Sequence, residues 1–408
     1  MEGWKWKHNE RAREEENKGS VGAFSVQEAK KAADFHKSFA GYEATPLRGL
    51  HNLAKHIGVA GVYVKDESYR FGLNAFKVLG GSYAIGRYLA DRLGMDMKDL
   101  SFDLLKSPAV KEKLGEITFA SATDGNHGRG VAWAAQQLGQ KAVIYMPKGS
   151  AQIRLDNIKA TGAEAYITEL NYDDTVRFVK ESAKEKGWVL VQDTAWEGYT
   201  EIPTWIMQGY MTMVSESLQQ LKEQGIEKPT HVFIQVGVGS IAGSIQGLFA
   251  SLFGESRPIT AIVEPDKADC HYLSAAAGDG KTRHVTGRMD TIMAGLACGE
   301  PNPISWAILN DYSDMFISCP DYVAARGMRV LGNPPGDDPR VVSGESGAVT
   351  TGILDFLLND QNLGEAREII HLNDRSIILV FNTEGDTDPE NYRKIVWDGT
   401  YPNYKEME

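Results

Sequence analysis

The chain has 408 residues, and its 43 basic and 55 acidic side chains give a formal net charge of −12 at pH 7. This acidic balance argues against a nucleic-acid or anionic-membrane partner, because both are bound by clustered lysine and arginine. No apolar run approaches the roughly 20 residues that cross a bilayer, and the polar N-terminus lacks the apolar core of a signal peptide, so a cytoplasmic protein is expected.

Short apolar runs alternate with amphipathic stretches from about residue 60 onward. In the first half of the chain, strands are predicted at 62–67, 117–122, 141–147, 164–170 and 188–194, and helices at 76–93, 125–139, 151–163 and 172–187. The more polar stretch 95–116 is predicted to be an insertion. Nearly continuous apolar strands joined through helices are typical of a parallel sheet covered on both faces.

A looser stretch at 195–204 marks a predicted crossing between two domains. Beyond it, strands are predicted at 231–237, 259–265, 316–318 and 376–382, and helices at 204–224, 240–253, 321–331 and 345–358. The expected fold class is therefore α/β, with two doubly wound domains, and residues 1–25 are expected to be flexible. Ligands of such folds bind beyond the carboxyl ends of the strands.

Cysteine is scarce. Cys270, Cys298 and Cys319 form no CxxC pair and no zinc-type spacing with histidine, so no metal site is predicted. A low, odd count is typical of a reduced cytosolic protein. Three buried thiols are the simplest interpretation, and a labile Cys270–Cys298 bridge is the alternative, since both residues flank glycine-rich turns.

The strand predicted at 231–237 leads through Gly237-Val238-Gly239-Ser240 into a helix. Free amides at a helix N-terminus, with glycines that allow close approach, suit a phosphate. The loop also matches the dinucleotide pattern G-x-G-x-x-A, which ends at Ala242, and Glu264 follows at about the usual spacing for that pattern. It therefore predicts a phosphate ligand, which could be a nicotinamide dinucleotide, while a purely structural turn is the alternative.

Polar residues follow three other predicted strands. Thr123-Asp124-Gly125-Asn126-His127 comes at a strand-to-helix turn, Asp193 follows the strand near 190, and Thr383-Glu384-Gly385-Asp386-Thr387 follows the last strand. Each group has a structural alternative: a helix N-cap for Asp124 or Asn126, a loop cap for Asp193, and an Asx or Ser/Thr turn for 383–387.

Lys77, in Phe71-Gly72-Leu73-Asn74-Ala75-Phe76-Lys77, lies at the start of an otherwise apolar helix. A cation is unfavourable beside the positive end of a helix dipole and in apolar surroundings, and both effects favour the neutral amine. That form makes a Schiff base with an aldehyde, although an apolar-flanked lysine can also simply reach out to water. Together with the phosphate loop and the polar strand ends, Lys77 favours an aldehyde cofactor over a nicotinamide.

From about Gly41 to Trp397, the chain resembles the fold-type II pyridoxal-phosphate enzymes, the group that contains threonine dehydratase, serine racemase and cysteine synthase. The likeness is carried by KDESYRFGLNAFK, TDGNHGRGVAWAAQQLG, YMPKGSAQ, VQDTAWEGYT, SGESGAV and FNTEGDTDP. It departs in the first 25 or so residues and at Phe381-Asn382. The resemblance implies a large cofactor-binding domain, 1–77 with 195–408, and a small domain, 78–194, with pyridoxal 5'-phosphate in the cleft between them.

Carried over residue by residue, the resemblance implies that Lys77 holds the cofactor as an imine and that the amides of Gly237, Val238, Gly239 and Ser240 bind its phosphate. Asn126 would hydrogen-bond the ring hydroxyl, and Thr383 would face the pyridine nitrogen. A neutral hydroxyl there, in place of a carboxylate, would leave the nitrogen unprotonated. That weakens the ring as an electron sink and suits elimination over transamination.

Asp124 differs from the small hydroxyl residue that the group often has before Gly-Asn-His. In racemase relatives that hydroxyl acts opposite the lysine, so Asp124 is expected to be a second general base that serves the other enantiomer. Asp193 adds a second negative charge at the same sheet edge. Unpaired carboxylates are costly in a closed site, so the two favour a substrate with an extra ammonium group. Tyr172 and Glu345 are expected to line its pocket.

The expected reaction is the α,β-elimination of D- or L-2,3-diaminopropionate to pyruvate and two ammonia; which of Asp124 and Asp193 binds the distal amine stays open. A threonine or serine dehydratase would share the cofactor contacts. A nicotinamide dehydrogenase would use the glycine loop and Glu264 but leaves Lys77 without a role, and a catalytically silent amino-acid-binding protein is a third alternative. A small amino-acid substrate and, from the resemblance, a homodimer are expected.

Overall fold

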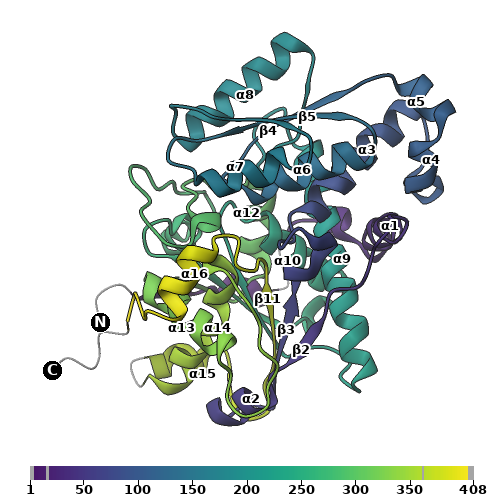
Figure 1. The fold of residues 1–408 in the computed structure, drawn as a ribbon. Coiled ribbons are helices and arrows are strands. Elements are labelled where there is room, and N and C mark those ends of the chain that lie inside the picture. The colour runs from purple at the N-terminus through teal and green to yellow at the C-terminus, as the bar shows by residue number, and fades with distance from the viewer. Residues whose placement is uncertain (1–3, 15–17, 361–362, 403–408) are drawn as a thin grey trace. The chain divides into compact units, whose positions relative to one another are not determined.

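The computed structural model describes residues 4–14, 18–360 and 363–402 (Figure 1). The chain divides into two compact units: the first contains residues 1–25, 45–69 and 216–408, and the second contains residues 26–44 and 70–215. The small domain expected at 78–194 falls inside the second unit, which also contains 26–44, 70–77 and 195–215. The domain boundaries after residues 77 and 194 stay a prediction.

The first unit is built on a sheet whose described strands have the order β1-β10-β9-β8-β11-β3-β2. They are β1 (Lys5–His8), β2 (Leu47–Gly49), β3 (Gly61–Asp66), β8 (His231–Gln235), β9 (Ile259–Pro265), β10 (Met315–Cys319) and β11 (Ile377–Asn382). The five inner strands are parallel, and the edge strands β1 and β2 are antiparallel to their neighbours. The carboxyl ends of β8 and β11 therefore lie side by side.

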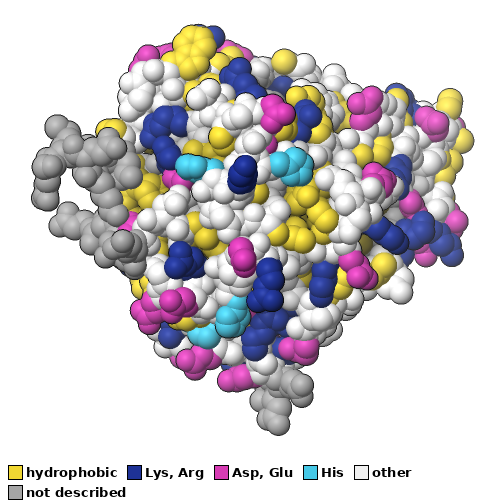
Figure 2. All heavy atoms as spheres, turned by 90° about the horizontal axis from the view of Figure 1, so that it is seen from below, with side chains coloured by type: hydrophobic (Ala, Val, Ile, Leu, Met, Phe, Trp, Pro, Cys, Tyr) yellow, Lys and Arg dark blue, Asp and Glu magenta, His cyan; other side chains and the backbone are white. Residues whose placement is uncertain are grey.

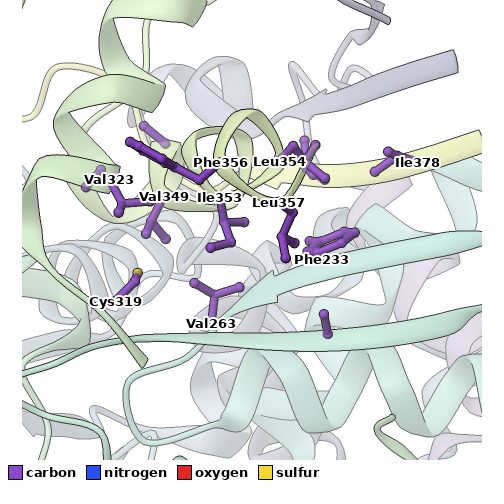
Figure 3. Close-up of a cluster of buried hydrophobic side chains, with 14 of the residues drawn as sticks. Phe233, Val263, Cys319, Val323, Val349, Ile353, Leu354, Phe356, Leu357 and Ile378 are labelled. Carbon is purple, nitrogen blue, oxygen red and sulfur yellow. The ribbon is translucent and has the colours of Figure 1, made fainter. Parts of the chain in front are cut away.

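Helices cover both faces of this sheet. They are α2 (His51–Ile57), α10 (Ser240–Phe253), α11 (Cys270–Ala277), α12 (Pro303–Tyr312), α13 (Asp321–Gly332), α14 (Glu345–Asn359), α15 (Gly364–Ile369) and α16 (Pro389–Val396). Figure 3 shows Ile353 and Leu357 of α14 packed over Phe233 and Val263 of the strands. Because side chains alternate along a strand, the equally buried Val232 faces the other side. The prediction of a two-faced sheet is confirmed for this unit.

The N-terminal segment differs from its predicted flexibility. Lys5–His8 pair with Met315–Ser318 as an edge strand, and the ring of Trp4 packs against Phe356 at a centroid distance of 5.3 Å. The half-buried ring of Trp4 supplies an apolar contact that helps to hold an otherwise polar strand. Residues 1–3 and 15–17, which the same prediction covers, lie outside the described residues.

The second unit contains a parallel sheet whose described strands have the order β6-β5-β4-β7. Its strands are β4 (Thr118–Ala122), β5 (Lys141–Met146), β6 (Glu164–Ile167) and β7 (Val189–Leu190), and its helices are α1 (Val26–Lys37), α3 (Val78–Leu93), α4 (Phe102–Lys106), α5 (Pro108–Leu114), α6 (Asn126–Gln137), α7 (Gln152–Lys159), α8 (Tyr172–Lys186) and most of α9 (Glu201–Glu223). Helix α8 covers one face, and α6 and α7 cover the other (Figure 1). The predicted insertion at 95–116 forms the short helices α4 and α5 and the 3₁₀ turn η4 (Met97–Asp99).

A glycine contact sets the crossing of α3 and α6. A Cβ atom added at Gly130 of α6 would lie 2.8 Å from the backbone nitrogen of Val78 and 3.1 Å from the carbonyl carbon of Lys77. Only glycine permits this approach of two backbones. The contact brings the start of α3, where Lys77 stands, against α6.

On the face shown in Figure 2, lysine and arginine side chains are interspersed with aspartate and glutamate. In the part of the chain that the structure describes, every helix is too short or too polar to cross a membrane.

Candidate active site

Lys77 immediately precedes α3 and has a helical backbone (φ −60°). It follows a turn in which Phe71 and Asn74 have positive φ angles of 50° and 58°. Its Nζ donates a hydrogen bond to Oδ2 of Asp193 and forms an ion pair with it. The Lys77 side chain is 19% exposed and that of Asp193 is 5% exposed, so the pair is largely shielded from water.

The charge state of Lys77 differs from the expectation. Burial lowers the pKa of the amine, but the Asp193 carboxylate, followed by Tyr210 and Asp124, raises it, and the net pKa lies above the ordinary value. The prediction that the surroundings favour the neutral amine is therefore wrong for this structure. It left out the paired carboxylate, which stabilises the ammonium form.

Asp193 follows β7, next in the sheet to β4, so its predicted place at the same sheet edge as Asp124 is confirmed. Burial raises the pKa of its carboxyl, but His127 and Lys77 lower it, and the net pKa is about 2. Asp193 is thus ionised and paired with Lys77 at neutral pH. It therefore does more than cap a loop, which was the structural alternative.

The turn between β4 and α6 is capped by Thr123. Its Oγ1 accepts hydrogen bonds from the backbone nitrogens of Gly125 at 2.9 Å and Gly128 at 3.0 Å. The capping role that Asp124 or Asn126 could have had therefore belongs to Thr123. Asp124 is half-buried, and its Oδ2 lies 3.7 Å from Nη1 of Arg154; Asn126 begins α6.

No role was assigned to His127 from the sequence. It is buried, and its Nε2 lies 2.8 Å from the carbonyl oxygen of Val191. A carbonyl only accepts, so Nε2 carries the hydrogen, and Nδ1 faces Oδ2 of Asp193 at 3.8 Å. Burial lowers the pKa of His127, while Asp193 opposes this, and the net pKa lies below the ordinary value.

Tyr210 of α9 is a second residue that sequence reasoning missed. Its ring packs on Phe76 at a centroid distance of 4.7 Å, and its hydroxyl is buried with no hydrogen-bond partner among the described residues. Burial raises the pKa of this phenol, and Lys77 opposes the rise. No sequence signal marks Tyr210, because it stands inside a long apolar helix far along the chain.

Tyr172, expected in the substrate pocket, is the first residue of α8. Its hydroxyl accepts a hydrogen bond of 3.1 Å from Nε2 of Gln192, whose Oε1 accepts one of 3.1 Å from the backbone nitrogen of Ala122. The second unit thus brings Lys77 and Asp193 into direct contact, and Tyr172 is hydrogen-bonded to Gln192, the residue before Asp193.

In the first unit, the glycine loop between β8 and α10 allows no residue larger than glycine at positions 237 and 239. Gly239 has φ +101°, and a Cβ atom there would lie 2.6 Å from Nε2 of His271 and 2.7 Å from Oγ of Ser305. A Cβ atom at Gly237 would lie 2.9 Å from the carbonyl oxygen of Gly295. The loop therefore has its shape because glycines stand at these positions.

Asn302 and Ser305, at the start of α12, form hydrogen bonds with this loop. The backbone nitrogen of Asn302 donates to the carbonyl oxygen of Val238 at 2.7 Å, and its Nδ2 donates to Oγ of Ser240 at 2.9 Å. Oγ of Ser305 donates to the carbonyl oxygen of Gly239 at 2.6 Å. The bonds to Val238 and Gly239 occupy loop carbonyls, which leaves the amide side of the loop to face an anion.

Thr383 follows β11 and is joined to the end of β8 through Gln235, whose Nε2 donates to Oγ1 of Thr383 at 3.0 Å. Glu345, expected in the pocket, is the buried first residue of α14 and accepts a hydrogen bond from Nδ2 of Asn391. The structure thus joins Thr383 to the strand that carries the glycine loop, whereas Glu345 is bonded to α16.

The dinucleotide interpretation of the loop finds no support at Glu264. This residue is fully buried, and its carboxylate accepts hydrogen bonds from the backbone nitrogens of His271 (3.0 Å) and Tyr272 (2.7 Å) and lies 2.8 Å from Nδ1 of His271. It caps α11 and is engaged away from any ribose. Nearby, Cys270 and Cys298 are not joined by a disulfide, and Cys319 forms none either, so the bridge alternative is not seen in this structure.

The residues present fit pyridoxal phosphate. A glycine cradle at the start of α10, which no side chain among the described residues caps, suits a phosphate. A neutral hydroxyl at Thr383 suits a pyridine nitrogen, and a lysine amine paired with a carboxylate suits an aldehyde. A dinucleotide would leave the last of these without a function.

Residues 39–372 match the pyridoxal-phosphate dependent enzyme family. The chain is 55% identical over 378 residues to a diaminopropionate ammonia-lyase of Escherichia coli strain K12, with 93% of each chain covered. The crystal structure of the Escherichia coli diaminopropionate ammonia-lyase with D-serine has a TM-score of 0.90 at 50% identity, with 98% of each chain covered. The structure of that enzyme with an aminoacrylate-PLP azomethine reaction intermediate has a TM-score of 0.88 at 51% identity and the same coverage.

Proposed function

Because the chain belongs to the pyridoxal-phosphate-dependent enzymes and, within them, to the diaminopropionate ammonia-lyase family, we propose that it converts 2,3-diaminopropionate and water to pyruvate and two ammonia. The predicted fold type, lyase class and cofactor are confirmed by this membership. The observation that carries the residue roles is the ion pair between Lys77, at the start of α3, and Asp193, which follows β7.

When bound, pyridoxal phosphate supplies a ring that accepts the electrons left when a substrate loses its α-proton. The Lys77 amine bonds the cofactor aldehyde and, once released, takes the α-proton of the L isomer at Nζ. Oδ2 of Asp193 accepts a hydrogen bond from that nitrogen and keeps it oriented. Its ionised state at neutral pH, with a pKa of about 2, suits this role.

Asp124 takes the α-proton of the D isomer at a carboxylate oxygen. Two features of its position support this assignment. Thr123 caps the turn before α6, so Asp124 does not have that role. The side chain of Asp124 is half-buried, and its charge raises the pKa of Lys77. Two bases that precede different helices, Lys77 before α3 and Asp124 before α6, let one site serve both enantiomers.

The remaining roles concern binding. The amides of Gly237, Val238, Gly239 and Ser240 bind the phosphate, Asn126 donates to the ring hydroxyl, and Thr383 faces the pyridine nitrogen. Tyr172 and Glu345 contact the substrate. We extend the proposal to a small amino-acid substrate, a homodimer and a cytoplasmic location; these rest on the family and on the scarcity of cysteine.

Turnover of the D isomer distinguishes the role of Asp124 from that of Lys77. Positioned acid–base groups typically contribute about 10²–10⁴-fold, so Asp124→Asn is expected to lower turnover of D-diaminopropionate by at least about 100-fold and to spare the L isomer more. Pyruvate release from each enantiomer in steady state is the measurement. Asp156→Asn, an exposed aspartate of α7 in the same unit, is the matched control and should change neither rate.

Equal losses on both isomers in Asp124→Asn would refute the division of labour between Lys77 and Asp124. The same assay with serine and threonine tests the dehydratase alternative, which uses the same cofactor contacts. Faster pyruvate or 2-oxobutyrate release from these substrates than from diaminopropionate would favour that alternative.

A further inference from the structure

Gln235 is the last residue of β8, in the interior of the sheet and directly before the segment that carries the glycine loop. It is 1% exposed. Its Nε2 lies 2.9 Å from the carbonyl oxygen of Phe381 and 3.0 Å from Oγ1 of Thr383. A single amide nitrogen therefore spans two positions at the end of β11.

The orientation of this amide follows from its first partner. A backbone carbonyl oxygen can only accept a hydrogen bond, so the atom that faces Phe381 must be the amide nitrogen. With the amide rotated, two oxygens would face each other at 2.9 Å. The nitrogen thus gives one hydrogen to Phe381 and the other to Thr383, and Oγ1 of Thr383 is the acceptor in its bond with Gln235.

This bond decides where the Thr383 hydrogen goes. A threonine hydroxyl has one hydrogen and two lone pairs, and the bond from Gln235 takes one lone pair. In the described part of the chain, no residue accepts the hydrogen of Thr383. Accepting a second bond would leave that hydrogen buried without a partner, which is unfavourable, so Thr383 is set to donate.

Burial of the Gln235 side chain is destabilising, so packing alone does not explain why this residue stands here. Its Oε1 is buried without a hydrogen-bond partner among the described residues, and a buried unpaired carbonyl is destabilising. The other residues of β8, Val232, Phe233 and Ile234, are apolar apart from His231 at its start. An apolar side chain at 235 would pack without this penalty, so the function of Gln235 lies in its amide nitrogen.

We propose that Gln235 is a positioning residue that makes Thr383 a hydrogen-bond donor to the pyridine nitrogen of pyridoxal phosphate and so keeps that nitrogen unprotonated. The proposal rests on the proposed function, which places Thr383 at the pyridine nitrogen. A protonated pyridine nitrogen would need a hydrogen-bond acceptor. The hydrogen bond from Gln235 makes Thr383 a donor instead. The consequence is a ring that withdraws electrons weakly, which suits elimination.

The test is ¹⁵N NMR of the holoenzyme loaded with pyridoxal phosphate labelled at the pyridine nitrogen, recorded from pH 6 to pH 9. In the wild type we expect the resonance of an unprotonated pyridine, unchanged with pH. In Gln235→Met, which keeps the length but loses the donor, we expect the nitrogen to titrate, with protonation favoured at least about tenfold, or one pKa unit. A structural role alone would not move this resonance.

Gln246→Met is the matched control. Gln246 is fully buried in α10, and neither of its amide atoms has a partner among the described residues, so this change should leave the resonance as in the wild type. In the Thr383→Val background, Gln235→Met should have no further effect, because Gln235 acts through Thr383.

A wild-type nitrogen protonated at neutral pH would overturn the proposal, even if Gln235→Met does not fold. A Gln235→Met resonance identical to the wild type would also overturn it, provided that Thr383→Val shifts the resonance. If Thr383→Val leaves the resonance unchanged, the placement of Thr383 fails instead. If the protein takes up no cofactor, the proposed function itself fails.

Discussion

Lys77 and Asp193 stabilise each other's charged forms, and this pairing gives the cofactor-free protein a dependence on pH. Because the pKa of Asp193, about 2, lies below its ordinary value of 3.8, its contribution is present above about pH 4 and is lost as the pH falls toward 2. A shift of this size corresponds to about 2 kcal/mol.

Asp193→Asn is therefore expected to lower the free energy of unfolding by about 2 kcal/mol at pH 7. Urea denaturation of the cofactor-free wild type and variant at a series of pH values measures the difference. We expect the gap to narrow below pH 4, because the wild-type carboxylate then becomes protonated as well. A gap that stays constant down to pH 3 would show that Asp193 stabilises the fold by some route other than its charge.

At the residue scale, sequence reasoning found the lysine, the carboxylates and the glycine loop because each stands at a strand or helix end with an unusual residue type. It could not find Tyr210, Gln235 or the tautomer of His127. These depend on which side chains meet across elements that are distant along the chain. For the same reason it assigned Lys77 the wrong charge, since its partner Asp193 lies 116 positions further along the chain.

The glycine loop and α10 form the element with the sharpest steric requirement. Gly239 and Gly254 flank α10, and both have positive φ, 101° and 52°, but a Cβ atom at Gly254 meets nothing within 4 Å. Alanine at either position costs about 1–2 kcal/mol of backbone strain. Only at Gly239 would the methyl group also strike His271 and Ser305.

We therefore expect Gly239→Ala to weaken binding of pyridoxal phosphate at least about tenfold, which corresponds to about 1.4 kcal/mol, and Gly254→Ala to leave it unchanged. Titration of the cofactor-free proteins, followed by visible absorbance, measures both affinities. Similar losses in the two variants would mean that strain alone, and not the shape of the loop, governs binding.

At the scale of elements, the long apolar strands and the helices between them were predicted to within a few residues, because their periodicity is strong. The elements that the sequence did not predict are either short or bury mainly small residues, so their apolar periodicity is weak. Helix α1 presents mainly alanines to its core, and β2 has three residues at a sheet edge. Their stability comes from tertiary contacts, which local patterns do not record.

For the whole molecule, cofactor binding is expected to raise the melting temperature by mass action. A ligand at 100 times its dissociation constant stabilises a protein by about 2.7 kcal/mol. Differential scanning calorimetry of the cofactor-free protein with increasing pyridoxal phosphate should show a rising transition. Pyridoxal at the same concentrations, which lacks the phosphate for the glycine loop, should raise it less. Equal shifts with the two compounds would contradict a phosphate site at Gly237–Ser240.

The α/β class followed from the pattern of elements, whereas the expected domain boundaries came from the resemblance. The chain's compact units join segments far apart in sequence, such as 26–44 with 70–215. Local periodicity carries no information about such long-range grouping. That part of the architecture therefore needed the structure.

The covalent bond between Lys77 and the cofactor is the claim on which the account depends most. Reduction of the holoenzyme with borohydride, followed by peptide mass spectrometry, would locate the phosphopyridoxyl group directly. We expect it on the peptide that contains Lys77 and its loss in Lys77→Ala. A phosphopyridoxyl group on another lysine, such as the buried Lys65 that is paired with Glu216, or on no lysine at all, would contradict the account.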